Sequence, residues 1–215
     1  MNYNDEELID KCSKLLNLMV LNSEELSMNG LDITQFDLFA SRLSAFRQIP
    51  SDNTLRNLLL ETQRQMRSKR MELLVTLRHF ENSARFAWGN DEKTYKVFHQ
   101  KNLPSIPDMD LLLFSRKVRV ATDQNFYILA QFGMTTTKRN NLQKLNDDFF
   151  TALKNFMRAA KFNGNKKMEK SEKSITLQSN FNQLANKSLS ILEKLNKQDS
   201  EVYKEIKELE IFEIN

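Results

Sequence analysis

The chain has 215 residues and a net charge of +4, and 40% of its residues are hydrophobic while 28% are charged. This composition is typical of a globular protein and excludes a mostly disordered chain. Only 4 glycines and 3 prolines are present, too few for the turns of an all-β or an α/β fold, so we predict long helices.

In the first half, turn-forming residues separate the predicted helices. Asn4 is a candidate N-cap, and Gly30 is suited to the left-handed conformation that ends many helices. Pro50 stops the second helix, which is rich in phenylalanine, and Gly89 closes the long third helix. The predicted helices lie at about 4–27, 32–48, 52–87 and 92–101.

The second half begins after a candidate linker that contains Pro104 and Pro107. A helix is expected to end at Gly133, and the threonines at 135–137 are candidate caps for the next one. The segment Asn-Gly-Asn at 163–165 predicts a further break. The predicted helices lie at about 108–132, 135–162, 166–195 and 200–211.

The order of elements in the first half recurs in the second half. Gly133 lies 103 residues after Gly30, and the Tyr-containing segment at 199–204 lies 108 residues after the one at 91–96. At the first offset, apolar residues also correspond: Phe39 with Leu142, and Phe46 with Phe149. Five extra residues around 163–170 would reconcile the two offsets. The recurrence indicates an internal duplication.

These observations predict an all-α fold. We expect an elongated antiparallel helical bundle that is built from two similar units of three to four helices. The N-terminal unit is predicted at 1–103 and the C-terminal unit at 104–215. Whether the two units pack as one domain or two stays open at this point.

The second half resembles a large family of uncharacterised helical-bundle proteins that is common in Bacteroidetes bacteria. The residues that carry the resemblance are Arg116, Ala121-Thr122, Gly133-Met134-Thr135, Leu142, Leu145, Phe149, Phe181, Leu184, Leu192 and 199–204. The chain differs from the family pattern in having Phe132 before the glycine and Ser-Glu-Val at 200–202. The resemblance implies a helical fold, and no function is known for the family.

Residue types that carry catalytic or metal chemistry are sparse. The two histidines, His79 and His99, belong to different predicted elements, and Cys12 is the only cysteine. Cys12 falls on an apolar helix face, where a thiol would be inert. The glycines form no phosphate-binding loop motif. We therefore expect no catalytic residue, no metal site, no cofactor and no enzyme activity.

Basic residues cluster at 64–70, 116–119 and 158–173. Most charge clusters are simply solvated, but these could contact an anion or a nucleic acid. The candidate contacts are Arg64, Arg67, Arg70, Arg158, Lys161, Lys166, Lys167 and Lys170. Arg70 interrupts the apolar face of the long third helix, so its guanidinium is expected to pair with an acidic residue of another helix or to reach solvent.

The N-terminal segment is acidic and has no apolar stretch, so we expect no signal peptide, no membrane span and a cytoplasmic location. The function favoured by these patterns is that of a non-enzymatic helical interaction or structural module. Its partner would be another protein or a second copy of the chain. The alternative is an accessory nucleic-acid-binding protein that uses the three basic clusters.

Overall fold

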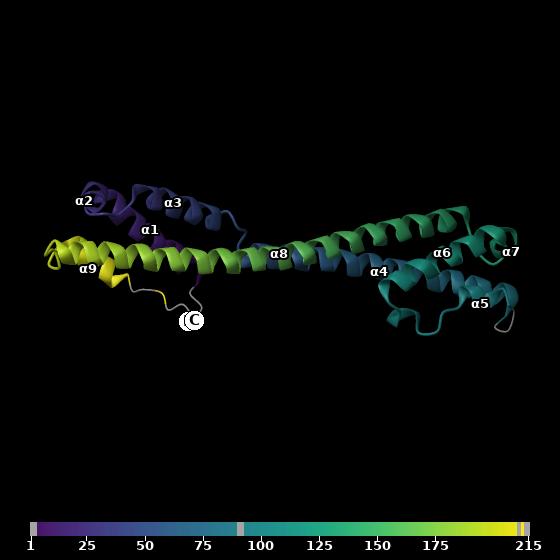
Figure 1. The fold of residues 1–215 in the computed structure, drawn as a ribbon. Helices are drawn as coiled ribbons and strands as arrows, with labels where there is room; N and C mark the ends of the chain where they lie inside the picture. The colour runs from purple at the N-terminus through teal and green to yellow at the C-terminus, as the bar shows by residue number, and fades with distance from the viewer. Residues whose placement is uncertain (1–3, 90–92, 210–211, 213–215) are drawn as a thin grey trace. The chain divides into compact units, whose positions relative to one another are not determined.

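The structure is a computed structural model that describes residues 4–89, 93–209 and 212. Helices make up 84% of it and the described residues contain no strand, which confirms the all-α prediction (Figure 1). The α-helices are α1 (Asp5–Leu21), α2 (Ser23–Met28), α3 (Ile33–Arg47), α4 (Asp52–Trp88), α5 (Tyr95–Phe98), α6 (Asp108–Gln124), α7 (Phe126–Ala130), α8 (Thr136–Lys194) and α9 (Glu201–Glu208). A 3₁₀ helix, η1 (Leu103–Ser105), precedes α6.

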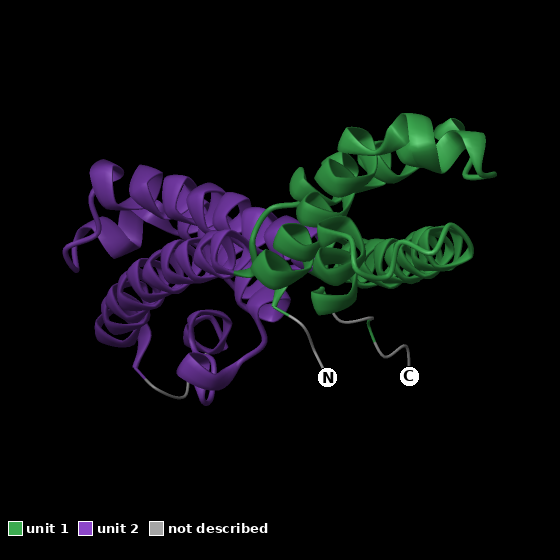
Figure 2. Ribbon diagram, turned by 90° about the vertical axis from the view of Figure 1, so that its left-hand side faces the viewer, with its two compact units in different colours: residues 1–52, 164–215 green, residues 53–163 purple. Residues whose placement is uncertain are grey.

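The chain forms two compact units (Figure 2). Unit 1 consists of Met1–Asp52 and Gly164–Asn215, and unit 2 consists of Asn53–Asn163. These boundaries differ from the predicted division into 1–103 and 104–215. The difference arises because the apolar face of α4 packs with α6, α7 and the first part of α8 rather than with α1 and α3.

Unit 1 has a core formed by α1, α3, the second part of α8, and α9. On α1, buried residues recur every three or four positions, which places them on one helix face. They are Leu8, Cys12, Leu15 and Met19. Aromatic rings of α3 and α8 fill the space beside them, and Phe181 meets Phe212 edge to face with ring centroids 4.7 Å apart.

Unit 2 has a separate core. Its central residues on α4 are Leu73, Leu77, Phe80 and Ala84, again at spacings of three and four. The short α5 contributes Phe98, which stacks on Trp88 with ring centroids 5.9 Å apart. Leu142 and Phe149 of α8 complete the core. The apolar face predicted for the long third helix is therefore in phase with the observed burial.

Two predicted helices are each divided by an asparagine. Asn22 separates α1 from α2, and Asn125 separates α6 from α7, so the single helices predicted at 4–27 and 108–132 were wrong. Each asparagine donates its side-chain amide to the carbonyl four residues earlier: Asn22 to Leu18 at 2.7 Å and Asn125 to Ala121 at 2.8 Å. Such side-chain bonds compete with the helical ladder, and both helices are interrupted there.

The two glycine corners have the expected backbone conformation. Gly30 has φ of +97° and Gly133 has φ of +82°, which confirms the positive φ predicted for Gly133. The next residue in each case donates its N–H five residues back: Leu31 to Leu26 at 2.9 Å and Met134 to Leu129 at 3.1 Å. This is the Schellman arrangement, in which only glycine adopts the left-handed position without strain.

The predicted break at 163–165 is wrong, because α8 runs without interruption from Thr136 to Lys194. Glycine in a helix interior costs only about 1 kcal/mol relative to alanine, which is too little to end a long helix. Gly164 is therefore the one glycine among the four that does not mark a helix end. Thr135 caps the start of α8 as predicted, accepting from the N–H of Lys138 at 3.2 Å.

The shorter elements also differ from prediction. The helix expected at 92–101 is reduced to α5, and residues 90–92 lie outside the described residues. The last helix ends at Glu208 rather than near 211, and 210–211 also lie outside the described residues.

Buried positions correspond between the two halves at the offsets noted in the sequence. At 103 residues, the buried pairs are Leu8 and Leu111, Cys12 and Ser115, Leu15 and Val118, Met19 and Thr122, Leu26 and Leu129, Leu31 and Met134, Phe39 and Leu142, Leu43 and Asn146, and Phe46 and Phe149. At 108 residues, they are Leu73 and Phe181, Leu77 and Ala185, Phe80 and Ser188, Ala84 and Leu192, and Phe98 and Ile206.

Candidate functional site

One side of α6 and α7 presents large apolar residues to solvent. The opposite side of α6 is buried in unit 2, through Leu111, Ser115, Val118 and Thr122. The exposed apolar residues are Met109, Leu113, Val120 and Tyr127, whose exposed fractions range from 52% to 84%. Spacings of four and seven place the first three on one helix face. We call these four residues, with Arg116 and Lys117 beside them, the α6–α7 face.

The fold does not require this surface to be apolar. Each apolar residue of the α6–α7 face has a polar counterpart 103 residues earlier on α1 or α2: Glu6, Asp10, Asn17 and Glu24. The exposed apolar residues of α1 and α2 stand at other positions, namely Val20, Leu21 and Met28. Several large apolar residues exposed on one side of a helix are typical of an interaction site. Sequence reasoning missed this face, although comparing exposed positions at that offset would have revealed it.

Arg116 and Lys117 place positive charge within the α6–α7 face, between Leu113 and Val120. Both are exposed and form no ion pair with any residue that the structure describes. Their neighbour Arg119 differs, since its Nε lies 3.9 Å from Asp123, which is also 3.7 Å from Arg139. The predicted basic cluster at 116–119 is thus divided between two available cations and one that takes part in a surface ion-pair network.

Arg70 is paired with an acidic residue of another helix, as predicted. Its Nε donates to Asp108 Oδ1 at 2.8 Å, and its side chain is only 18% exposed. The remaining nitrogens donate to two backbone carbonyls, Pro104 at 3.0 Å and Ile106 at 2.8 Å. Arg70 therefore fastens the segment before α6 to α4, and its donors are directed at protein groups.

Lys170 is also held by carboxylates within unit 1. Its Nζ contacts Asp5 and lies 3.0 Å from Asp52 Oδ1, and the side chain is 12% exposed. Burial alone would lower the pKa of this ammonium, but the hydrogen bonds to the two carboxylates outweigh burial and raise that pKa. Lys170 joins the start of α1 and the start of α4 to α8.

A second ionic cluster lies on the same helix. Glu169 accepts from Lys166 at 2.6 Å and lies 2.8 Å from Lys173. Hydrogen bonds from these two lysines lower the pKa of Glu169 to about 2. Among the predicted anion contacts, Lys166 and Lys170 are therefore engaged by acidic residues.

The remaining predicted contacts are solvent-exposed. Arg64 and Arg67 lie on α4, and Arg158, Lys161 and Lys167 lie on α8. None of the five takes part in an ion pair with a described residue. They lie on two helices, and the residues of α8 belong to different units, Arg158 and Lys161 to unit 2 and Lys167 to unit 1.

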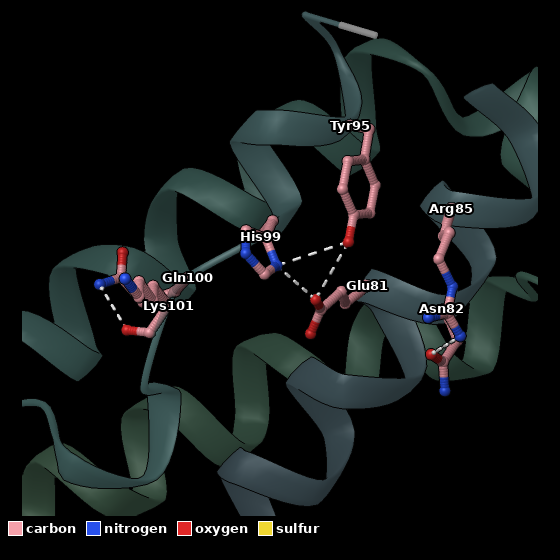
Figure 3. A network of polar contacts seen from close by, with 7 residues as sticks. All are labelled: Glu81, Asn82, Arg85, Tyr95, His99, Gln100 and Lys101. Carbon is pink, nitrogen blue, oxygen red and sulfur yellow. Dashed lines mark hydrogen bonds and ion pairs between the residues drawn. The ribbon is translucent and has the colours of Figure 1, made fainter. Parts of the chain in front are cut away.

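A polar cluster that the sequence did not single out joins α4 to α5 (Figure 3). His99 Nδ1 lies 2.6 Å from Glu81 Oε1, and the Tyr95 hydroxyl donates to the same oxygen at 3.3 Å. Burial and then the Glu81 carboxylate raise the pKa of Tyr95. In unit 1, Tyr203 of α9 donates to Glu193 of α8 at 2.8 Å. Both units thus tie a short helix to a long one through a hydrogen bond from a tyrosine to a glutamate.

The cysteine is buried. Cys12 is 0% exposed on the inner face of α1, and burial raises the pKa of its thiol to about 12 although Arg47 acts in the opposite direction. A thiol with this pKa stays protonated at neutral pH and is a poor nucleophile.

No known protein family, curated protein or solved structure matches the chain. The resemblance to a Bacteroidetes family therefore stays a prediction. In the described part of the chain, no helix is long and apolar enough to span a bilayer. No group of three or more His, Cys, Asp or Glu side chains among the described residues is placed to hold a metal ion.

Proposed function

We propose that the chain is a non-enzymatic, cytoplasmic interaction module that binds another protein through a helix face. The α6–α7 face is the observation that carries this proposal. Apolar side chains exposed by half or more cost free energy in water unless a partner covers them. Arg116 and Lys117 within it supply charges that orient a partner and speed encounter.

A non-catalytic role is supported by what the ionisable side chains do. Arg70 and Lys170, the two basic residues most deeply placed among the predicted contacts, hold helix ends together. The Glu81, Tyr95 and His99 cluster has a counterpart in unit 1 that uses different residues for the same attachment. These groups stabilise the helices without needing a substrate.

We further propose that the chain arose by duplication and that the two copies exchange their C-terminal parts. The segment α1–α3 corresponds to α6, α7 and the start of α8, while α4–α5 corresponds to the rest of α8 and α9. Each compact unit combines the first part of one copy with the second part of the other. Exchange of equivalent elements is a low-cost way to join two copies, since the same contacts form in either arrangement.

The interaction function can be tested with tagged full-length protein and extract from the native cells. Retained proteins would be identified by mass spectrometry for the wild type, for Leu113→Glu with Val120→Glu, and for the matched control Arg64→Glu. We expect a specific protein that the wild type and control retain and the face variant loses. If all three chains retain the same proteins, the α6–α7 face is not the interaction site.

Nucleic-acid binding is the second candidate, because five exposed cations form no ion pair with a described residue: Arg64, Arg67, Arg158, Lys161 and Lys167. Retention on heparin and on immobilised DNA would be compared at several salt concentrations. Phosphate binding weakens steeply as salt rises, and each lost phosphate contact reduces that dependence. Strong retention that Arg64→Glu with Arg67→Glu weakens would favour this function over protein binding.

A further inference from the structure

A groove on unit 1 has properties complementary to the α6–α7 face. It has a volume of about 440 Å³ and lies between α1 and α9, where Leu18, Leu21 and Leu209 form its apolar part. Glu205 and Glu208 of α9 line the same groove. We call it the α1–α9 groove.

The groove carries negative charge that no part of the described chain neutralises. Glu205 and Glu208 are both exposed, and neither forms an ion pair with a described residue. The one cation of the groove, Lys14, lies 2.8 Å from Asp10 and is 61% exposed. A ligand with apolar side chains and one or two cations would cover the leucines of the groove and pair with its glutamates.

The α6–α7 face supplies that combination. Leu113 and Val120 stand on the same side of α6, and Arg116 and Lys117 lie between them along the helix. A row of apolar residues at i and i+7 with adjacent basic residues is the pattern by which an amphipathic helix enters an apolar groove with an acidic border. Both surfaces are exposed within one chain, so each is available to a second molecule.

We propose that the α6–α7 face of one copy of this chain docks into the α1–α9 groove of a second copy. This inference rests on the proposed interaction function and names its partner. The contact joins two different surfaces, so every copy carries one of each.

Sedimentation velocity of the full-length chain tests the proposal, over a range from about 1 µM to about 500 µM that covers weak contacts. The weight-average mass of the wild type should rise with concentration, and less so in high salt, because the pairs at the border are screened. A face variant, Leu113→Glu with Lys117→Glu, and a groove variant, Glu205→Lys with Glu208→Lys, should each weaken association about tenfold or more. Arg64→Glu is the matched charge-reversal control and should associate like the wild type.

Mixing the two variants gives the sharper result. The face variant keeps an intact groove and the groove variant keeps an intact face, so one pair of surfaces remains available. An equimolar mixture should associate more strongly than either variant alone, because the intact face of one variant meets the intact groove of the other. Far-ultraviolet circular dichroism of both variants should match the wild type, because all four substituted side chains are exposed.

Three results would overturn the inference: a wild type that remains a single chain throughout, variants that associate as the wild type does, or a mixture that does not combine. Binding of the wild type to phosphatidylglycerol vesicles, lost in the face variant and without self-association, would also overturn it by assigning the face to a membrane. If self-association is absent but the extract experiment still yields a protein that Leu113→Glu with Val120→Glu loses, the proposed function stands and only its partner is wrong.

Discussion

Helices α1 and α6 both begin with an aspartate, and the two units anchor that residue differently. Asp5 contacts Lys170 of α8 in unit 1, and Asp108, which lies 103 residues after Asp5, pairs with Arg70 of α4 in unit 2. The long helices correspond at an offset of 108, which aligns Arg70 with Gln178 rather than with Lys170. A cation lies near this carboxylate in both units, and it comes from a different turn of the long helix in each.

The surroundings of the two cations also differ. Lys170 is shared between two carboxylates, whereas Arg70 has one carboxylate and two backbone carbonyls. A planar guanidinium can donate hydrogen bonds to three acceptors at fixed angles, while an ammonium acts as a compact point charge. Unit 2 uses arginine where an irregular segment must be held, and unit 1 uses lysine where two helix starts meet.

Among the changes that test this comparison, removing Arg70 should lower the stability of the fold most. Arg70→Ala is expected to lower the free energy of unfolding by about 2–3 kcal/mol, because Asp108 and two carbonyls lose a charged donor. Urea unfolding followed by fluorescence of Trp88, the only tryptophan, would report on unit 2. The exposed Arg67 is the matched control, and Arg67→Ala should stay within about 0.5 kcal/mol of the wild type. Equal effects of the two changes would show that the anchor contributes no stability.

Substitutions of the glycines should change stability by an intermediate amount. Gly30→Ala and Gly133→Ala should each cost about 1 kcal/mol or more, because both residues have positive φ. Gly164 lies inside α8 with open space where a Cβ would stand, so Gly164→Ala should instead stabilise by up to about 1 kcal/mol. Thermal unfolding followed by circular dichroism would measure all three. A loss of stability in Gly164→Ala would contradict the continuous α8.

Local chemistry in the sequence predicted most of the helices. Proline at position 50 lacks an N–H and ends α3, and the glycines at the two corners supply positive φ, so these boundaries were predictable. Gly164 was mistaken for an end because glycine only weakens a helix, and the outcome depends on the packing of both flanking segments. The breaks at Asn22 and Asn125 depend on the backbone carbonyl to which each side-chain amide donates. A pattern of apolar residues does not encode that hydrogen bond.

The composition of the compact units was not predictable in the same way. Periodicity states which face of α4 is buried but not which helix covers it, and the two halves offer nearly equivalent surfaces. The pairing of Arg70 was predictable because a charge on a buried face needs a partner, although Asp108 itself was not identified. The α6–α7 face was missed because an exposed apolar residue has no local signature until its position in the fold is known.

The smallest predicted effect is on the pH dependence of stability. It tests the contribution of Glu169, the neighbour of Lys170 on α8. Lys166 and Lys173 lower the pKa of Glu169 from 4.5 to about 2 in the folded chain. A carboxyl whose pKa is lower in the folded state stabilises the fold above its unfolded pKa, and that contribution is lost as pH falls from about 4.5 to about 2. Glu169→Gln should therefore be less stable than the wild type at pH 6 and equally stable near pH 2, as measured by urea unfolding across this range.

Arg70→Ala, in unit 2, is the control for this prediction because it leaves Glu169 unchanged. The stability that Glu169 contributes to this variant should still be lost as pH falls from about 4.5 to about 2. A difference between Glu169→Gln and wild type that stays constant with pH would mean that the two lysines do not favour the charged carboxylate.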